Sequence, residues 1–180
     1  MKKLMFVFIA SLVIVACRTA DDKTAGNDST KSASNESVTY VSPIAYSSDF
    51  EMGNSKQAQT VVSLWKDFDE NNLKNGIASF ADSIRMDFPG MTMAGTRDSV
   101  MATTQGYRDG FTKISSTVDV VLPLRSKDKN EDWVGIWGME TKTDKAGKTD
   151  SIRIHEIWRF NKDGKIDYMA QFIQPQAAMK

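Results

Sequence analysis

The best candidate for chemistry in this sequence is an acidic side chain on an otherwise apolar face of a predicted strand. Between Ser151 and Phe160, strand alternation puts Glu156 on one face with four apolar residues, Ile152, Ile154, Trp158 and Phe160. A buried, unpaired carboxylate is too costly to persist, so this group must be neutral, paired with a cation or in contact with water in a cavity. Two interpretations remain open: a pocket acid that binds a ligand or transfers protons, and a structural glutamate near the rim of the sheet.

Two other titratable side chains are weaker candidates. Asp87 precedes Phe88 and Pro89, and alternation turns its side chain away from the face of Phe88 unless a bulge re-aims it. His155 has the opposite alternation to Glu156, so we expect it to face solvent or a dimer interface. The catalytic candidates are therefore Glu156 and Asp87.

The sequence lacks the patterns that bind metals, nucleotides or nucleic acids. One Cys and one His exclude a site built only from Cys and His ligands, and there is no glycine-rich phosphate loop and no Gly-x-Ser-x-Gly elbow. Lys plus Arg and Asp plus Glu each total 23, so no net field attracts a polyanion. We expect no cofactor, no metal and no nucleic-acid partner.

At 180 residues the chain has room for one domain, and its patterns place helices first and strands last. Apolar residues at spacings of three and four predict an amphipathic first helix, and later alternation predicts a strand that ends in a Pro-Gly turn. The elements predicted in this half are a helix capped by Ser55 with Phe68 as its last apolar residue, a helix from Leu73 to Ala81, a strand with Ile84, Met86 and Phe88 on one face, and a helix capped by Thr96 that runs to Gly106 or Gly110.

Four strand segments follow, separated by polar turn segments at 127–130, 144–148 and 161–164. They cover residues 112–124, 133–143, 151–160 and 165–173. Short polar turns join antiparallel neighbours, and such a sheet needs cover on one face, which three preceding helices can give. The sequence therefore predicts an α+β domain, with a cavity where helices and sheet diverge.

The first residues have the layout of a secretory signal. Two lysines precede a 13-residue apolar run from Leu4 to Ala16, which is too short for a membrane-spanning helix of about 20 residues. Ala16-Cys17 at its end resembles the lipobox of bacterial lipoproteins, in which the cysteine becomes the acylated first residue of the mature protein. The alternative is an ordinary signal peptide in which Cys17 is incidental. A lipid-anchored protein of the cell envelope is expected, on the outer membrane, its periplasmic side or the cell surface.

Residues 17–54 are predicted to be the lipidated Cys and a flexible linker, because the segment after Cys17 is dominated by small polar residues with no helical or strand period. Its one apolar stretch, 38–46, either docks on the domain as a short strand or arm or belongs to the same tether. The domain is expected to span residues 55–180, after a signal peptide at 1–16.

Several short segments in the domain resemble the NTF2-like superfamily, and within it the SnoaL-like and ketosteroid-isomerase-like branches. They are Trp65, Asn71-Asn72-Leu73, Ala78 to Asp82, Phe88-Pro89-Gly90, Gly95-Thr96-Arg97 and Trp158 to Ile166. The resemblance implies a cone-shaped α+β half-barrel, with about three N-terminal helices on a curved, mainly antiparallel sheet. It also implies a largely apolar pocket and, often, a homodimer through the sheet. It does not imply an activity.

The ketosteroid-isomerase pattern is only partly present. Trp65 stands where that family has a helix Tyr, and Phe88 stands where it has the Asp base. Only Glu156 keeps an acid at the third position. The expected pocket residues are Trp65, Phe88, Met101, Tyr107, Trp137, Glu156 and Trp158, with Trp133 and Met139 as further aromatic or thioether candidates and Met91 and Met93 near the cavity mouth.

Three functions are compatible with these residues. The first is a lipid-anchored protein whose pocket binds a small, partly apolar molecule or a partner without turning it over. The second is a pocket enzyme of isomerase, dehydratase or hydrolase type that uses Glu156. The third is a dimeric interaction module whose cavity is filled by side chains. A cavity of about 300 Å³ or more with two converging polar groups favours the first two.

Overall fold

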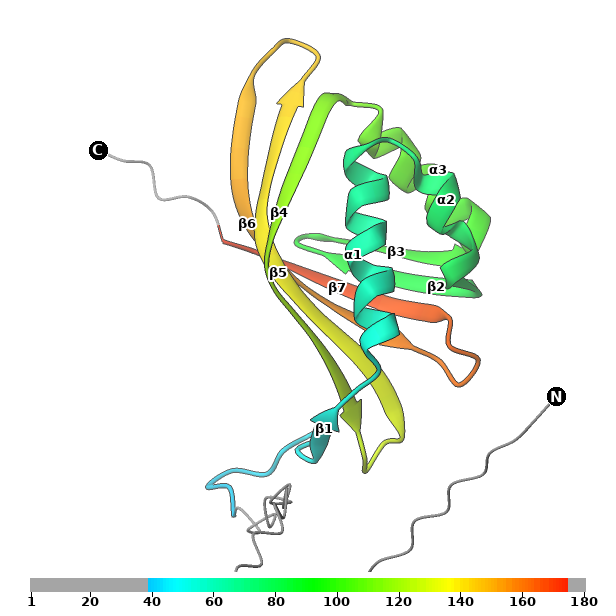
Figure 1. The fold of residues 1–180 in the computed structure, drawn as a ribbon, viewed down its shortest axis with the longest axis vertical. Helices are drawn as coiled ribbons and strands as arrows, with labels where there is room; N and C mark the ends of the chain where they lie inside the picture. The colour runs from blue at the N-terminus through cyan, green and yellow to red at the C-terminus, as the bar shows by residue number, and fades with distance from the viewer. Residues whose placement is uncertain (1–38, 175–180) are drawn as a thin grey trace, which may run out of the picture. The chain divides into compact units, whose positions relative to one another are not determined.

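The computed structural model describes residues 39–174, and those from Tyr40 onward form one unit that contains all the helices and strands of this range (Figure 1). The predicted signal, Cys17 and most of the linker lie outside the described residues. The elements in chain order are β1 (Phe50–Met52), α1 (Ser55–Asp69), α2 (Leu73–Gly76), a 3₁₀ turn (Ile77–Ser79), β2 (Phe80–Phe88), β3 (Met91–Thr96), α3 (Arg97–Arg108), β4 (Phe111–Ser126), β5 (Glu131–Asp144), β6 (Thr149–Phe160) and β7 (Ile166–Gln174). None of the helices in this range is both long and apolar enough to cross a membrane.

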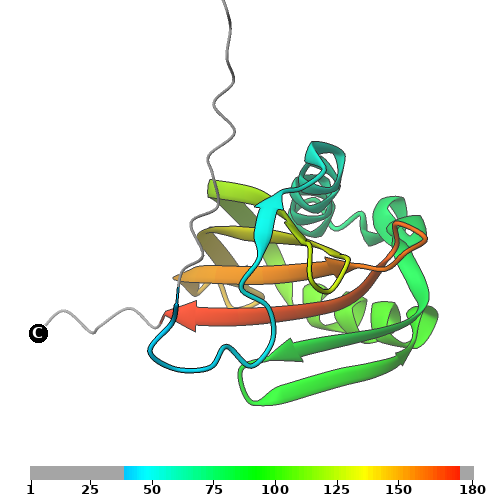
Figure 2. The same cartoon turned by 90° about the horizontal axis from the view of Figure 1, so that it is seen from below.

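The strands form a single seven-stranded sheet in the order β1-β4-β5-β6-β7-β2-β3. The last four strands, β4 to β7, pair as successive antiparallel neighbours, as the polar turns between them predicted. In contrast, β2 pairs with β7 in parallel. Figure 2 shows β6 and β7 side by side, with β2 and β3 continuing the sheet beyond β7. In Figure 1 the α-helices lie on the same side of β4, β5 and β6. This arrangement confirms the predicted α+β class with helices on a curved, mainly antiparallel sheet.

Two predicted helix boundaries are wrong. Asn54, and not Ser55, is the N-cap of α1, since its side-chain oxygen accepts from the amide of Lys56 at 2.9 Å. The helix predicted from Leu73 to Ala81 ends at Gly76, and β2 already begins at Phe80. Phe80 leaves the helical pattern because its side chain is buried in the core and its backbone pairs with Ile166 of β7. The cap of α3 at Thr96 is confirmed.

β3 is an edge strand that pairs only with β2, and the sequence patterns did not predict it. Pro89-Gly90 is the turn of this β2–β3 hairpin, and Gly90 has a φ of +78°, a conformation that favours glycine. Only three of the six residues of β3 are apolar, and its last residue, Thr96, is also the N-cap of α3. It forms because it completes the edge of the sheet beside β2.

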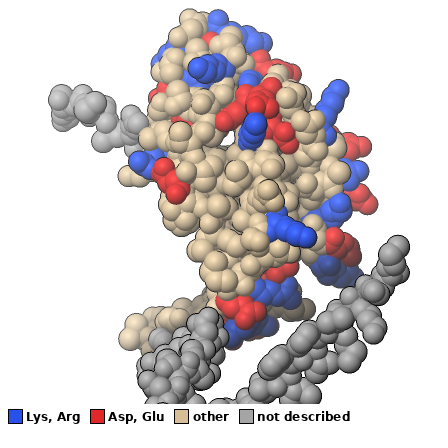
Figure 3. Space-filling model, viewed as in Figure 1, with Lys and Arg blue, Asp and Glu red and all other residues tan. Residues whose placement is uncertain are grey.

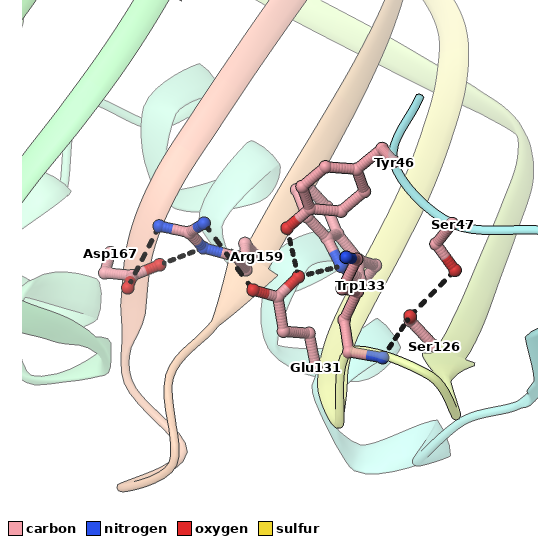
Figure 4. A network of polar contacts seen from close by, with 8 residues as sticks. Tyr46, Ser47, Ser126, Glu131, Trp133, Arg159 and Asp167 are labelled. Atoms are coloured by element: carbon pink, nitrogen blue, oxygen red, sulfur yellow. Dashed lines mark hydrogen bonds and ion pairs between the residues drawn. The ribbon is translucent and has the colours of Figure 1, made fainter. Parts of the chain in front are cut away.

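Part of the predicted linker docks on the domain. The Tyr46 hydroxyl donates to Glu131, and its ring meets Trp133 edge-on at 6.2 Å between centroids (Figure 4). Further along, β1 pairs with β4. Gly53, which follows β1, lies directly against the backbone of Leu124, because a Cβ at this position would be only 2.8 Å away from it. The packed domain therefore begins upstream of residue 55. Of the stretch 38–46, Tyr46 contacts the domain, whereas Val41 is fully exposed and residue 38 lies outside the described residues. The strand that pairs with the domain is formed by the later residues 50–52.

A buried arginine fixes the C-terminal end of α1 against α3 and β4. Arg108 is 4% exposed, and its guanidinium donates to the carbonyl oxygens of Phe68, Asp69 and Phe111 at 2.6, 2.8 and 3.0 Å. The first two carbonyls belong to the last turn of α1, where the helix leaves acceptors unpaired and where a positive charge is favourable. The Asp69 carboxylate in turn accepts from the amide and hydroxyl of Ser116 at 2.7 and 2.9 Å. These contacts set where α1 lies over the sheet.

Candidate functional site

A cavity of about 350 Å³ lies between the helices and the inner face of the sheet. Its walls come from the three α-helices, from β2 and β3, and from β4 to β7, and most of the lining residues are apolar. The volume is within the range of small-molecule sites, about 300–1,000 Å³. Figure 3 shows a broad area with few charged side chains over the middle of the domain in this view, with a cluster of acidic and basic side chains above it and others along the edges.

Glu156 lies in the lining of this cavity, 5% exposed, and is held by three neutral donors. The indole nitrogens of Trp65 and Trp158 donate to its Oε2 at 2.6 and 3.0 Å, and the amide of Gln171 donates to its Oε1 at 2.8 Å. The three partners come from α1, β6 and β7. No cation of the described residues forms an ion pair with this carboxyl group, so its environment differs from that of a structural salt bridge.

Burial raises the pKa of Glu156 above its ordinary value, because the apolar surroundings disfavour the charged carboxylate. The hydrogen bonds from Gln171, Trp65 and Trp158 favour the charged form and act in the opposite direction, but desolvation is the largest contribution. The negative charge of nearby Glu140 raises the pKa further. The cavity therefore holds a carboxyl group that remains protonated at higher pH than an exposed glutamate.

A second polar cluster in the lining, formed by Glu140, Lys142 and Tyr107, was not among the predicted pocket features. The ammonium of Lys142 donates to Glu140 at 2.8 Å and to the hydroxyl of Tyr107 at 3.0 Å. Burial lowers the pKa of Lys142, but these two hydrogen bonds more than offset it and leave the pKa raised. Strand alternation is the pattern that could have predicted this cluster, because Glu140 and Lys142 lie on the same inward face of β5 as Val134 and Ile136.

Six of the seven expected pocket residues do line the cavity: Trp65, Phe88, Met101, Tyr107, Glu156 and Trp158. The expectation for Trp137 is wrong. Its neighbours Ile136 and Gly138 are buried on the inner side of β5, so alternation turns Trp137 to the outer face of the sheet. The outer face also contains Trp133 and Met139, by the same alternation. Met91 and Met93 line the cavity from β3.

Asp87 lies outside the cavity lining, so the alternative in which a bulge re-aims it is also wrong. Its carboxylate is paired with Arg85 at 2.9 Å and accepts from the hydroxyl of Thr92 at 2.7 Å. The hydrogen bond from Arg85, followed by that from Thr92, lowers the pKa of Asp87. It is therefore an ionised surface carboxylate on the opposite face from Phe88.

His155 is on the outer face of the sheet, where its ring lies between those of Trp137 and Phe172. The ring centroids are 5.1 and 6.2 Å apart. Within residues 39–174, no three His, Cys, Asp or Glu side chains gather in a way that could hold a metal ion.

No protein-family model and no curated protein matches the sequence, but solved structures match the fold. The domain is similar to an NTF2-like protein of unknown function from Exiguobacterium sp. 255-15 (TM-score 0.55, 19% identity, 65% of this chain and 99% of that chain). It is similar to a protein named as a SnoaL-like polyketide cyclase from Jannaschia sp. CCS1 (TM-score 0.56, 13% identity, 71% and 91%). It is also similar to TerC co-crystallised with polyporic acid (TM-score 0.53, 13% identity, 66% and 91%). The fold of the domain is therefore NTF2-like, and identities this low show the fold and not an activity.

Proposed function

We propose that this domain binds a small, largely apolar molecule in its cavity and that Glu156 recognises a polar group of that molecule. The observation that carries the proposal is the pairing of a 350 Å³ apolar cavity with a buried carboxyl group held only by neutral donors. A cavity of this size also argues against the interaction module with a filled core. The crystal of TerC with polyporic acid supports the proposal, because a protein of the same fold was crystallised with a small organic molecule.

The hydrogen bonds of Glu156 indicate which polar group it would meet. Its Oε2 accepts from two indoles, whereas its Oε1 accepts from Gln171 alone. When the group is protonated, the proton therefore belongs on Oε1, where it is available to an acceptor oxygen of the ligand. A molecule with an apolar body and a carbonyl or ether oxygen fits this arrangement best.

We expect a tryptophan placed in the cavity to prevent binding. Thr104 of α3 lines the cavity, and in Thr104→Trp the indole takes up volume that the ligand needs. Ala102→Trp is a matched control, since Ala102 is an exposed residue of the same helix outside the lining. Native mass spectrometry should find small molecules that co-purify with the parent and with Ala102→Trp but not with Thr104→Trp. Equal retention by both variants would contradict binding in this cavity.

A pocket enzyme is the second candidate, favoured by the same buried carboxyl group. A carboxyl group whose pKa burial raises, in a largely apolar cavity, suits a general acid or base, because it holds its proton at higher pH than an exposed glutamate does. Asp87 cannot assist, because it is on the other face of β2. Glu156→Gln keeps the shape of the side chain and removes the proton transfer. If a substrate is found, turnover that survives this substitution excludes a catalytic role for Glu156.

We propose further that the protein is a lipoprotein of the cell envelope, anchored to the outer membrane, on its periplasmic side or at the cell surface, through acyl chains on Cys17. The signal-like residues 1–16 and the polar segment after Cys17 support this. The docked arm enters the domain beside Glu131, at the opposite end of β5 from Glu140 and Lys142 of the cavity lining. The tether would therefore attach away from that end of the cavity.

Anchoring predicts that the protein partitions into a detergent phase and that Cys17→Ser partitions into the aqueous phase. Intact mass spectrometry should show diacylglycerol and an N-acyl chain on the mature parent only. A parent protein without lipid would leave Cys17 as an incidental residue after an ordinary signal.

A homodimer through the outer face of the sheet is our proposal for the assembly. This face presents a row of register partners across four strands, Val120, Trp137, His155 and Phe172, and Phe172 is 56% exposed. An apolar row of this kind fits a second copy of itself. Sedimentation of the parent should show a dimer and that of Phe172→Glu a monomer, whereas a monomeric parent would contradict the proposal.

A further inference from the structure

Methionines make up an unusual share of the cavity wall. Five of them line it: Met86, Met91, Met93, Met101 and Met169. Three of these form a row across adjacent strands, because Met93 of β3 is the register partner of Met86 in β2, which is the partner of Met169 in β7. Opposed residues of an antiparallel pair such as β2 and β3 have Cβ atoms about 4.5–5.5 Å apart, and Met169 continues the row on the parallel neighbour β7. It ends beside Trp158, the partner of Met169 in β6 and a donor to Glu156.

The exposure of these thioethers falls from the mouth of the cavity to its interior. Met91 is 53% exposed and Met93 is half-buried, whereas Met86 and Met169 are each 3% exposed. Both outer methionines lie on β3, an edge strand that pairs only with β2. Edge strands with few buried neighbours open more readily than central strands, which gives solutes access to Met93 as well.

We propose that Met91 and Met93 are an oxidant-sensitive gate to the cavity, an inference that rests on the proposed binding function. Hydrogen peroxide transfers one oxygen atom to the thioether sulfur. The sulfur loses two electrons and becomes a sulfoxide, the O–O bond breaks, and the peroxide is reduced to water. No other reactant is needed. Exposed methionines react before buried ones, so the two residues of β3 react before Met86 and Met169.

Oxidation at this place would weaken the binding of apolar molecules. A sulfoxide is polar and less flexible than a thioether, and at Met91 and Met93 it replaces apolar lining next to Phe88 and Met86, their partners in β2. When a ligand covers the sulfoxide, its oxygen loses its hydrogen bonds to water, and an apolar ligand offers no donor in their place. This unpaired oxygen should weaken binding about tenfold or more. Exposure to peroxide would thus release the ligand or prevent its uptake.

The test uses the purified protein and the neutral fluorescent probe 6-propionyl-2-(dimethylamino)naphthalene, which has an apolar body, a ketone oxygen and no hydrogen-bond donor. Binding is measured before and after mild peroxide treatment, and peptide mass spectrometry identifies the oxidised residues. We expect oxidation of Met91 and Met93 to raise the probe's Kd about tenfold. The double variant Met91→Leu/Met93→Leu should show the same Kd before and after treatment. Met52→Leu is the matched control, because Met52 is 67% exposed on β1 outside the cavity lining, and this variant should lose affinity as the parent does.

The outcomes separate the two proposals. If the untreated parent does not bind the probe and Thr104→Trp behaves identically, the proposed binding function fails. If the untreated parent binds and its Kd is unchanged when Met91 and Met93 are oxidised, the gate is wrong while the pocket stands. A loss of affinity that persists in the double variant would assign the effect to other residues and would also overturn the gate.

Discussion

Replacement of Arg108 with methionine is expected to lower the free energy of unfolding by about 3 kcal/mol. The substitution removes three hydrogen bonds from a charged donor, each worth roughly 1.5–3 kcal/mol in favourable cases, and leaves the carbonyls of Phe68, Asp69 and Phe111 without that partner. Methionine recovers part of this through its apolar contacts. The C-terminal end of α1 should loosen first, because two of the three carbonyls belong to it.

Chemical denaturation followed by circular dichroism measures this change. Arg108→Lys should be intermediate, since a lysine ammonium cannot reproduce the planar geometry of the guanidinium. Arg153→Met is a matched control, because Arg153 makes an exposed ion pair with Asp119 and such pairs contribute roughly 0–1 kcal/mol. Equal stabilities of Arg108→Met and Arg153→Met would contradict the structural role given to Arg108.

The stability of the parent protein is expected to depend on pH through Glu156. The pKa of this carboxyl group is raised in the folded state, so the folded protein binds a proton that the unfolded chain has lost. Its contribution is fully present below the ordinary glutamate pKa of about 4.3 and is lost as pH rises through the raised folded pKa. In that window the free energy of unfolding falls with pH by up to about 1.4 kcal/mol per unit.

Glu156→Gln should abolish this slope, because the amide has the shape of the protonated acid and does not titrate. Above the raised pKa the variant should be more stable than the parent. Unfolding free energies measured from pH 4 to pH 9 for both proteins give the difference directly. A difference that does not change with pH would show that Glu156 does not titrate in this range.

Much of the fold could be predicted from local patterns. Alternation predicted the strands β4 to β7, and the polar turns between them predicted their antiparallel order. The chemistry of helix caps predicted Thr96. All three patterns act over only a few residues. The parts that were missed depend on partners far along the chain. β1 forms on the edge of β4, β3 forms on β2, and Phe80 leaves its predicted helix to pair with Ile166.

Strand alternation predicted the part of the candidate site that lies on β6. Glu156 was identified because the residues on its face of the strand, both before and after it, are large and apolar. On β5 both faces carry large apolar side chains, because Trp137 alternates with Ile136, so the local pattern does not show which face is the inner one. Trp137 was therefore predicted in the cavity, and the pair Glu140–Lys142 was not predicted. The neutral partners Trp65 and Gln171 lie 91 and 15 residues away, and no local pattern indicates that they meet Glu156.

The central claim is that a titrating carboxyl group of Glu156 faces a cavity that binds small molecules. Carbon-13 NMR of the Glu156 side-chain carboxyl, assigned by comparison with Glu156→Gln, tests it most directly. The account predicts a titration midpoint clearly above 4.3 and a change in the resonance when 6-propionyl-2-(dimethylamino)naphthalene, whose ketone oxygen can accept from Glu156, is added. A midpoint at or below that value, together with a resonance that does not respond to the probe, would contradict it.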